Sequence, residues 1–597
     1  MDRIQDGAAG IGQNSMPQDR AVWLRLLAAA LATAVLLVGF DILYDRFFYR
    51  DIDDILRGIQ IRQFLDHGGW YDLTIRGIDM PGAYVSPWSR LIDLPYVVLA
   101  WALQFILPRE AAVHWALRLW QPALLVAFCL LWIGAARKLS GKVAIEPLHV
   151  VAAFALMPLT LWEFTPGRID HHNVQIVMLM VVVYGVACWS YAGGFVAGLG
   201  IVLSFLIGLE LAPVLLVLLL GICFAFVFGV TGGRRMLAGL ATSMLVTTPL
   251  GGLLFLGPQR MMGAECDAFS APYVSAFFGF AIIIAFASIF LRSAGRGMRL
   301  FYLAITAVLL IGALALAFPS CLAGPYGFID PVARALWLDR VQQERSILDF
   351  YSEGELIKVA CIACIAVVAL AALPSVRRQM QVANAPFAII FATGLVLLLL
   401  TLIQTRFMRF PAAVVLLFIP IVWTEVKERF PGARQALFVS LALCLSAGVA
   451  LWFVVPQRKL VLELLDYMTV DLCTNIDAAP LQGLPPGRIV APSSLGLFLL
   501  DRLPPGMTIN SISFHRAAPG MRAMFDVFLS TDSATRKAAI APFDYLAVCR
   551  YDVAPYIPND TLFARLMRGG DWPGLTLIHD GQPGTPRLFR IDHALFE

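Results

Sequence analysis

Residues 194–230 have the sequence GFVAGLGIVLSFLIGLELAPVLLVLLLGICFAFVFGV, in which Glu210 is the single charged side chain. A helix needs about 20 apolar residues to cross the hydrocarbon core of a bilayer. The stretch contains two runs that approach this length, 194–209 and 211–230, and Glu210 separates them. It therefore predicts two membrane spans joined by a tight hairpin. Glu210 would lie at the tip, where a structural role is the simpler interpretation.

The whole chain has the composition of a membrane protein. Of its 597 residues, 59% are hydrophobic and 14% are charged, whereas soluble domains carry about 25% charged residues. The net charge of +4 is too small to indicate the basic surface that is typical of nucleic-acid-binding proteins. We therefore expect membrane lipids, and no nucleic acid, as partners. Apolar runs predict about thirteen spans, at 22–40, 112–136, 146–163, 172–190, 194–209, 211–230, 236–256, 273–291, 300–317, 355–373, 386–404, 409–425 and 435–455.

The charges between the spans predict the orientation, because short cytoplasmic loops of membrane proteins are rich in Lys and Arg. One further apolar run, LIDLPYVVLAWALQFILP at 91–108, would place every basic cluster outside if it were a full span. We therefore predict that 91–108 is an interfacial or re-entrant helix. The clusters that are then cytoplasmic are Arg137–Lys138–Lys142, Arg234–Arg235, Arg292–Arg296–Arg299, Arg377–Arg378 and Lys427–Arg429–Arg434.

These assignments predict a mostly α-helical fold. It is a multi-pass transmembrane bundle in the cytoplasmic (inner) membrane, with a small α/β domain outside. Residues 1–21 are polar and are expected to be a disordered cytoplasmic N-terminus. The bundle would occupy 22–455. Short β-like runs such as RIVAPS predict that 456–597 is the extracytoplasmic domain. The predicted outer loops are 41–111, 164–171, 257–272 and 318–354.

The first outer loop begins with an acidic segment, DILYDRFFYRDIDDILRG at 41–58. Carboxylates beside a membrane span are costly unless they are solvated, paired or metal-bound. Their hard oxygen atoms are typical ligands of divalent cations. Two interpretations therefore stay open, a solvated loop paired with its own arginines and a metal site. The candidate side chains are Asp53 and Asp54.

The second outer loop runs into a predicted helix with the sequence FTPGRIDHHNVQ at 164–175. Asp170 is placed to cap that helix, but capping needs neither the two consecutive histidines nor the preceding Gly–Arg. Asp and His together are typical of metal binding or of acid–base chemistry. We therefore predict a functional role for Asp170 and His172. Secondary candidates are Arg168, His171 and Glu210.

The later outer segments add three charged candidates and four cysteines. Glu344 lies in the loop 318–354, where it is by itself equally compatible with a solvated surface. Arg406 and Arg409 follow a span on the outer side, against the usual charge bias. Arginine suits phosphate, which it binds bidentately, although an interfacial arginine is the alternative. Candidate disulfide cysteines, with the pairing open, are Cys266, Cys321, Cys473 and Cys549.

In their order along the chain, these features resemble the oligosaccharyltransferase catalytic-subunit group of the GT-C membrane glycosyltransferases. The shared features are an acidic first outer loop, an Asp–x–His in the next, a Glu in a long later loop and an Arg after a late span. The segment SPWSRLIDLP at 86–95 also resembles a loop of lipid-donor glycosyltransferases. The resemblance covers residues 22–455. It implies a divalent metal, Mg or Mn, on Asp53 or Asp54 with Asp170, His172 and Glu344, and a donor phosphate on Arg406, with Arg409 as a second candidate.

The resemblance implies an enzyme with Asp53, Asp54 and Asp170 as catalytic candidates. It would move a sugar or an oligosaccharide from a polyprenyl-phosphate or -diphosphate donor to an acceptor at the outer membrane face. The Trp–Trp–Asp motif of protein-glycosylating members is absent after residue 456, so the acceptor stays open between a glycan, a lipid and a protein. The alternatives are a transporter or flippase of lipid-linked saccharides and a non-catalytic assembly subunit. Charges gathered in outer loops rather than within spans favour the enzyme over the transporter.

Overall fold

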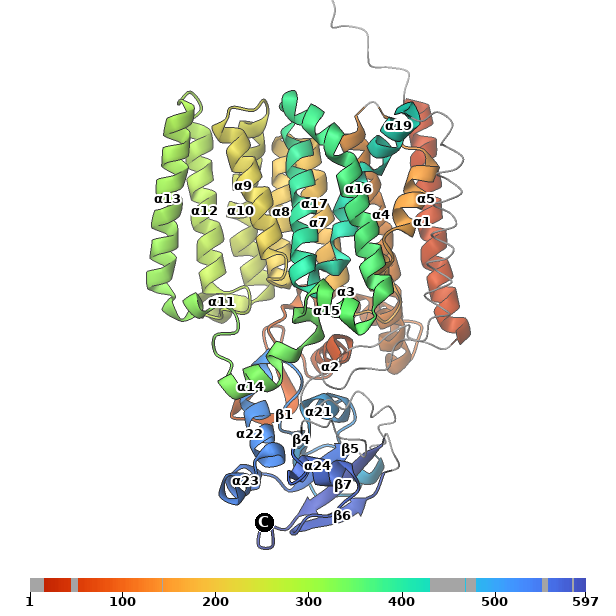
Figure 1. The fold of residues 1–597 in the computed structure, drawn as a ribbon, viewed down its shortest axis with the longest axis vertical. Coiled ribbons are helices and arrows are strands. Elements are labelled where there is room, and N and C mark those ends of the chain that lie inside the picture. The colour runs from red at the N-terminus through yellow and green to blue at the C-terminus, as the bar shows by residue number, and fades with distance from the viewer. Residues whose placement is uncertain are drawn as a thin grey trace, which may run out of the picture.

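The computed structural model describes residues 16–44, 52–141, 143–429, 468, 479–549, 557–581 and 585–596. It consists of a block of roughly parallel helices and a smaller domain at one end of that block (Figure 1). The connection between α12 and α13 and the one between α16 and α17 lie at the opposite end of the block (Figure 1). Two of the predicted cytoplasmic clusters, Arg292–Arg296–Arg299 and Arg377–Arg378, belong to these connections and their flanking helix ends.

Within the described residues, seven helices are long and apolar enough to cross a membrane, or eight if a bent pair is one span. The bent pair joins α5 (Pro147–Ala155) to α6 (Pro158–Leu161) and the 3-10 turn η1 (Trp162–Phe164) at 78°. Shorter apolar helices are α7 (His172–Cys188), α8 (Tyr191–Ile207) and α9 (Ala212–Val227). The long helices are α1 (Met16–Tyr44), α4 (Arg109–Ser140), α10 (Gly233–Phe255), α12 (Ala271–Phe290), α13 (Arg296–Ala317), α16 (Leu356–Gln381) and α17 (Ala385–Ile403).

The helices confirm the predicted multi-pass membrane bundle. The quoted stretch forms the hairpin of α8 and α9, with Glu210 in the turn. The predicted span 409–425 corresponds to α18 (Pro411–Val415), η6 (Leu416–Phe418) and α19 (Ile419–Arg429), whereas 435–455 lies outside the described residues. The run 91–108 contains α3 (Arg90–Leu103), whose 14 residues are fewer than the roughly 20 that a span requires.

Small residues allow the central helices to approach closely. A Cβ atom on Gly194 of α8 would lie 2.1 Å from the carbonyl oxygen of Met236, and one on Gly239 of α10 would lie 1.9 Å from that of Tyr191. Helices in a bilayer gain little from hydrophobic burial against each other, so close backbone packing of this kind supplies much of their attraction. The pair α8–α10 is therefore a rigid part of the scaffold on which the Glu210 hairpin is built.

The smaller domain contains a seven-stranded mixed sheet with the order β2-β1-β4-β3-β5-β7-β6. Five strands confirm the β-like runs predicted in the C-terminal region, and the other two come from the first outer loop. Ile78 of β1 pairs in parallel with Ile509 of β4, so segments more than 400 residues apart share one sheet. The strands are β1 (Thr74–Met80), β2 (Gly82–Val85), β3 (Gly487–Val490), β4 (Met507–Ile509), β5 (Tyr545–Cys549), β6 (Leu575–His579) and β7 (Pro586–Ile591).

One hydrophobic core joins this sheet to the outer loops. It includes Ile55 and Leu56 of α2 (Ile52–His67), Trp337 after α14 (Pro331–Leu336), and the strands. The first outer loop is thus held between the membrane block and the C-terminal domain. The helical elements of the domain are α21 (Ser493–Leu500), α22 (Ala518–Leu529), α23 (Ser533–Ile540), α24 (Leu562–Met567), η8 (Ala479–Leu481) and η9 (His515–Ala517). Short elements in the connections between the membrane helices are α11 (Gly257–Met262), η2 (Pro319–Ala323), η3 (Leu338–Arg340), η4 (Gln342–Glu344), α15 (Ile347–Glu353) and η5 (Thr405–Arg409).

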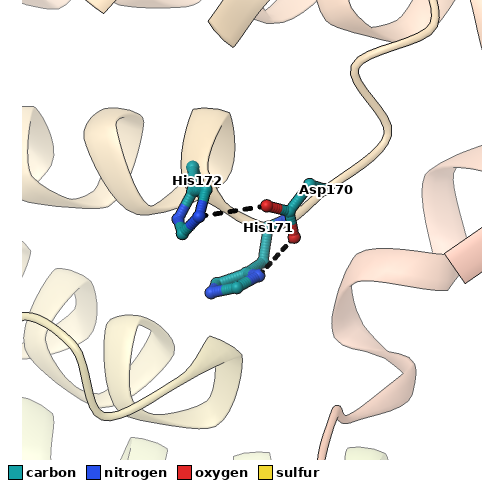
Figure 2. Close-up of side chains that lie close together, drawn as sticks. All are labelled: Asp170, His171 and His172. Atoms are coloured by element: carbon teal, nitrogen blue, oxygen red, sulfur yellow. Dashed lines mark hydrogen bonds and ion pairs between the residues drawn. The ribbon is translucent and has the colours of Figure 1, made fainter. Parts of the chain in front are cut away.

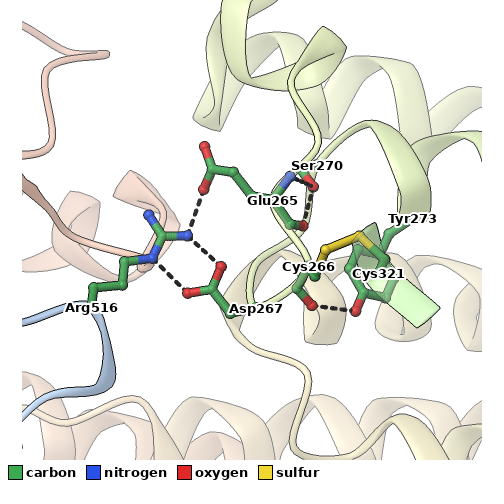
Figure 3. Close-up of a disulfide and its surroundings, with 7 residues drawn as sticks. All are labelled: Glu265, Cys266, Asp267, Ser270, Tyr273, Cys321 and Arg516. Atoms are coloured by element: carbon green, nitrogen blue, oxygen red, sulfur yellow. Dashed lines mark hydrogen bonds and ion pairs between the residues drawn. A yellow bond between two sulfur atoms is a disulfide. The ribbon is translucent and has the colours of Figure 1, made fainter. Parts of the chain in front are cut away.

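A cluster of ion pairs ties the loop 257–272 to the C-terminal domain (Figure 3). Arg516 donates to both carboxylate oxygens of Asp267, at 2.5 and 2.8 Å, and to Glu265 at 2.6 Å. Next to them, Cys266 and Cys321 form a disulfide, as the sequence suggested, and link that loop to 318–354. Cys549 is also disulfide-bonded, and Cys473 lies outside the described residues.

Replacing Arg516 with alanine should loosen this attachment, because the buried Asp267 would lose the arginine that donates to both of its oxygens, whereas Glu265 would keep its pair with Arg260. Removing one partner of a buried ion pair typically costs about 3–5 kcal/mol. We expect Arg516→Ala to lower the midpoint of thermal unfolding, followed by intrinsic fluorescence of the purified protein. Arg522→Ala is the matched control, because Arg522 forms more exposed pairs with Asp330 and Asp526 that contribute less than about 1 kcal/mol.

The same attachment should weaken in acid. Burial alone would raise the pKa of Asp267, but hydrogen bonds and charges from His515 and Arg516 hold that pKa well below its ordinary value of 3.8. A lowered folded-state pKa means that this stabilisation is present above pH 3.8 and is lost as the pH falls through the folded-state value. An unfolding midpoint with the same acid dependence in wild type and Arg516→Ala would contradict this role.

Candidate active site

The predicted polar residues of the outer loops meet where α2 and the start of α7 come together, at the end of the membrane block that faces the C-terminal domain. Asp54 lies in the first turn of α2, and Asp170 lies two residues before the N-terminus of α7. The first two turns of α2 are buried at every position from Asp54 to Ile61, and hydrogen bonds from Arg168 and Asp170 to Asp54 hold the two segments side by side. Both aspartates are buried, with exposed fractions of 0% and 1%.

Asp54, rather than Asp53, faces the cluster. One oxygen of Asp54 accepts a hydrogen bond from Arg168 at 2.7 Å, and the other accepts from the backbone N–H of Asp170 at 3.0 Å. Asp53 is half-buried and lies within electrostatic reach of Tyr84 instead. A single step along a helix turns the side chain by about 100°, so one of two adjacent aspartates faces the site and the other faces away.

The Asp–His–His sequence forms a compact group (Figure 2), and the Glu210 carboxylate lies beside it. The Asp170 carboxylate lies 2.5 Å from Nδ1 of His171 and 3.1 Å from Nε2 of His172. On the other side, Nδ1 of His172 lies 3.0 Å from the Glu210 carboxylate. The turn between α8 and α9 therefore places the hairpin's one charged side chain in the site. Glu210 contacts the site residues in addition to its place in the turn.

This group has the composition of a divalent-metal site. One ligand atom from each of Asp170, His171 and His172 lies within 4.8 Å of the others. Within the described residues, Asp170 Oδ2, His172 Nδ1 and both Glu210 oxygens are buried without a hydrogen-bond partner. Buried polar atoms without partners are rare and costly. Carboxylate oxygens and imidazole nitrogens are the donors that bind divalent cations, so the residues present fit a metal ion.

Burial and neighbouring charges act in opposite directions on the two acids. Burial alone would raise the pKa of Asp170, but His171 and Arg168 hold that pKa well below its ordinary value. For Glu210, burial wins over His171 and Arg406 and raises the pKa to about 7. The site therefore pairs a firmly ionised carboxylate with one that a bound cation would help to ionise.

A second buried network supports Asp54. Arg168 also donates to Glu163 at 2.9 Å, and Glu163 pairs with Arg409 at 3.2 Å. Arg409 is thus paired with Glu163, and its role as a phosphate ligand stays a prediction. Glu163 was not among the residues that the sequence singled out. The available signal was an acidic residue at the end of the predicted span 146–163, since ionisable residues within spans are usually functional or paired.

Arg406 and Glu344 lie together on the far side of Glu210. Arg406 forms an ion pair with Glu344, and Gln404 donates to the other oxygen of Glu344 at 3.0 Å. Burial alone would lower the pKa of Arg406, but Tyr326, Glu210 and Glu344 together raise it. The structure therefore brings the predicted arginine and the predicted glutamate next to the Asp170 group, with Glu210 between them.

The segment SPWSRLIDLP at 86–95 holds α2 in place. Asp93 is fully buried and accepts hydrogen bonds from Gln60 at 2.6 Å and from Arg90 at 2.9 Å. Arg57, one turn after Asp54, pairs with Asp93 and packs over the ring of Trp88 at 4.1 Å. The Trp88 ring in turn lies 6.0 Å from the ring of His171, so this segment contacts both halves of the site.

No protein-family model and no curated protein matches this sequence, but its fold matches solved structures. Archaeal oligosaccharyltransferase AglB from Archaeoglobus fulgidus, in complex with an inhibitory peptide and a dolichol-phosphate, has a TM-score of 0.65 at 14% identity, covering 94% of this chain and 80% of that one. The Archaeoglobus fulgidus enzyme with Zn and sulfate has a TM-score of 0.56 at 14% identity, covering 88% and 68%. Tethered to an acceptor peptide with the NVT sequon, it has a TM-score of 0.54 at 15% identity, covering 93% and 72%. The predicted resemblance is confirmed for the fold, which is similar to that of these oligosaccharyltransferase structures.

Purified protein should bind one Mn²⁺ ion at this group, because two carboxylates and two imidazoles converge there. We expect Asp170→Asn to weaken Mn²⁺ binding by at least about tenfold, the lower end of losses seen even for indirect metal partners. Electron paramagnetic resonance of free Mn²⁺ measures this directly. Asp526→Asn, an acidic residue of α22, is the matched control. Equal Mn²⁺ affinity of the two variants would contradict the assignment.

Proposed function

We propose that this protein is a membrane glycosyltransferase of the outer face of the cytoplasmic membrane. It would transfer a sugar or an oligosaccharide from a polyprenyl-phosphate or -diphosphate donor and depend on a divalent metal. The observation that carries the proposal is the buried Asp170–His171–His172 group with Glu210, flanked by Arg406 and Asp54 at the membrane surface. A related fold was solved with a dolichol-phosphate, which supports a lipid-linked donor.

The residues divide into a leaving-group side and an acceptor side. Asp170, His171, His172 and Glu210 would hold the metal, which supplies positive charge to the leaving phosphate. Arg406 adds a second positive group to that phosphate, and Glu344 orients Arg406 through their ion pair. The imidazoles among the ligands favour a transition-metal ion over Mg²⁺, and Mn²⁺ serves as the probe because carboxylates suit it as well. Asp54 and Glu344 were first expected as metal ligands, but each is paired with an arginine. We therefore assign Glu344 to positioning Arg406, and Asp54 to contact with the acceptor.

Asp54 stands on the acceptor side. Its carboxylate accepts N–H groups from Arg168 and from the backbone of Asp170, which hold it in place beside the Asp170 group. The acceptor hydroxyl would donate its proton to Asp54 as its oxygen forms a bond to the anomeric carbon. The bond between that carbon and the phosphate oxygen breaks, and the polyprenyl phosphate or diphosphate leaves with the electron pair.

Asp170→Asn and Asp54→Asn should each reduce transfer by about 100-fold or more, the loss typical when one electrostatic group of a transition-state site is removed. The full-length protein in proteoliposomes would receive membrane lipid extract that contains radiolabelled polyprenyl-linked sugar, with and without Mn²⁺. Transfer is measured as release of unglycosylated polyprenyl phosphates. Asp526→Asn is again the control. Full activity of either site variant, or movement of the labelled lipid across the bilayer without sugar release, would contradict the proposal.

Arg406 should affect donor use more than folding, because its side chain lies at the edge of the site with an exposed fraction of 22%. We expect Arg406→Gln to raise the KM for the donor and to lower kcat, with Arg406→Lys recovering part of kcat. Lysine keeps the charge but cannot bind phosphate bidentately. Arg522→Gln is the control for loss of an arginine. Identical kinetics of Arg406→Gln and wild type would contradict a phosphate contact.

A further inference from the structure

Two neighbouring cavities lie beside α2, and the first also lies beside the segment that contains Arg168, the donor to Asp54. The first has a volume of about 540 Å³ and is formed by α2, the start of α4 and the segment before Asp170. The second, of about 340 Å³, lies against α3. Leu65 and Arg109 line both cavities, so the two are adjacent.

The two cavities differ in chemistry. The first combines basic and acidic side chains, Arg62 and Arg109 with Asp66 and Glu110, over the apolar floor of Val113. The second is lined mainly by apolar side chains, including Val97, Val98 and Trp101. Trp101 and Val98 are 63% and 52% exposed on α3, a helix too short to span the bilayer. An exposed tryptophan in such a helix is typical of the membrane–water interface.

The charges of the first cavity favour a neutral headgroup with many hydroxyls. Arg109 is ion-paired with Asp66, and Arg62 with Asp501, so these arginines are balanced by carboxylates. A phosphate would be repelled by Asp66 and Glu110, whereas a sugar offers both donors and acceptors to such pairs. The combination of a polar cavity for hydroxyls and an apolar one for a chain matches an amphiphile with a saccharide headgroup.

The position of the first cavity relates it to the reaction. Gly167 and Ile169 line it on either side of Arg168, which donates to Asp54. Arg62 follows Asp54 on the same helix, about 12 Å further along its axis. A displacement at the anomeric carbon brings the acceptor in from the side opposite the leaving group. With the phosphate at Arg406, that side is the one occupied by Asp54 and these cavities.

We propose that the two cavities form the acceptor site and that the acceptor is a glycolipid, with its saccharide in the first cavity and its hydrocarbon chain in the second. This inference rests on the proposed function, because the transfer step supplies the reason for an acceptor there. It selects one of the acceptor classes that the sequence left open. A hydroxyl of the bound saccharide would face Asp54 and receive the transferred sugar.

A photoreactive dodecyl maltoside with a diazirine in its chain tests the site without depending on turnover. The full-length protein in lipid nanodiscs should be labelled on α3, at peptides that contain Val98 and Trp101. An excess of unlabelled dodecyl maltoside should compete, and dodecyl phosphate should not. Val113→Trp, which fills the first cavity, should reduce labelling at least tenfold. Val151→Trp, at an exposed position of α5, should be labelled like wild type.

Arg109→Gln covers the case in which Val113→Trp does not fold, because the Arg109–Asp66 pair is about half exposed and contributes little to stability. It should reduce labelling by the maltoside several-fold and leave labelling by a photoreactive dodecyl phosphate unchanged. Equal labelling by both probes in wild type, labelling elsewhere, or displacement of the maltoside by a peptide with an Asn-Val-Thr sequon would overturn the glycolipid assignment.

The donor assay separates this inference from the proposed function. If Asp170→Asn abolishes sugar release from the donor but keeps wild-type maltoside labelling, both stand. If wild type releases no sugar while the labelling is as expected, the glycosyltransferase assignment fails and the acceptor role fails with it, although an amphiphile site remains. If sugar is released and labelling is absent, the glycolipid acceptor alone is overturned.

Discussion

Asp54 is fully buried at the membrane surface, and it can stay ionised there because Arg168 and the backbone N–H of Asp170 both donate to it. A buried carboxylate without partners would be costly by several kcal/mol. These two hydrogen bonds therefore oblige α2 and the segment before α7 to lie together. That contact places Asp170 and the two histidines, and it orients α2 so that one end carries Asp54 and the other lines the cavities.

The charges around Asp54 alternate in sign through the site. Arg409 pairs with Glu163, Glu163 with Arg168, and Arg168 with Asp54. Beyond Asp170, Glu210 lies between His172 and Arg406, and Arg406 pairs with Glu344. Each charge is thus compensated by a neighbour. In the Asp170 group, Asp170 Oδ2, His172 Nδ1 and both Glu210 oxygens lack a hydrogen-bond partner among the described residues, and there a cation would complete the alternation.

The C-terminal domain is part of the site's support. Its sheet includes β1 and β2 from the first outer loop, and its core includes the apolar face of α2. The Arg516 ion pairs and the Cys266–Cys321 disulfide add a second attachment through the loops 257–272 and 318–354. Because both attachments act on loops that carry or flank the polar site, the domain restrains the site from the aqueous side while the helices restrain it from the membrane side.

The sequence by itself determined the membrane class, the hairpin of α8 and α9, and that 91–108 contains a helix too short for a full span. The length and hydrophobicity of an apolar run are local properties of the sequence, and they directly predict a membrane-spanning helix. It also placed Asp170, His172, Glu344 and Arg406 at the ends of apolar helices or in the connections between them, as the structure confirms. Only the tertiary structure decided between Asp53 and Asp54, because that choice depends on how α2 is rotated by its packing. The roles of Glu210 and Glu163 and the sharing of one sheet by β1 and β4 likewise depend on contacts between residues far apart in the chain, which no local pattern encodes.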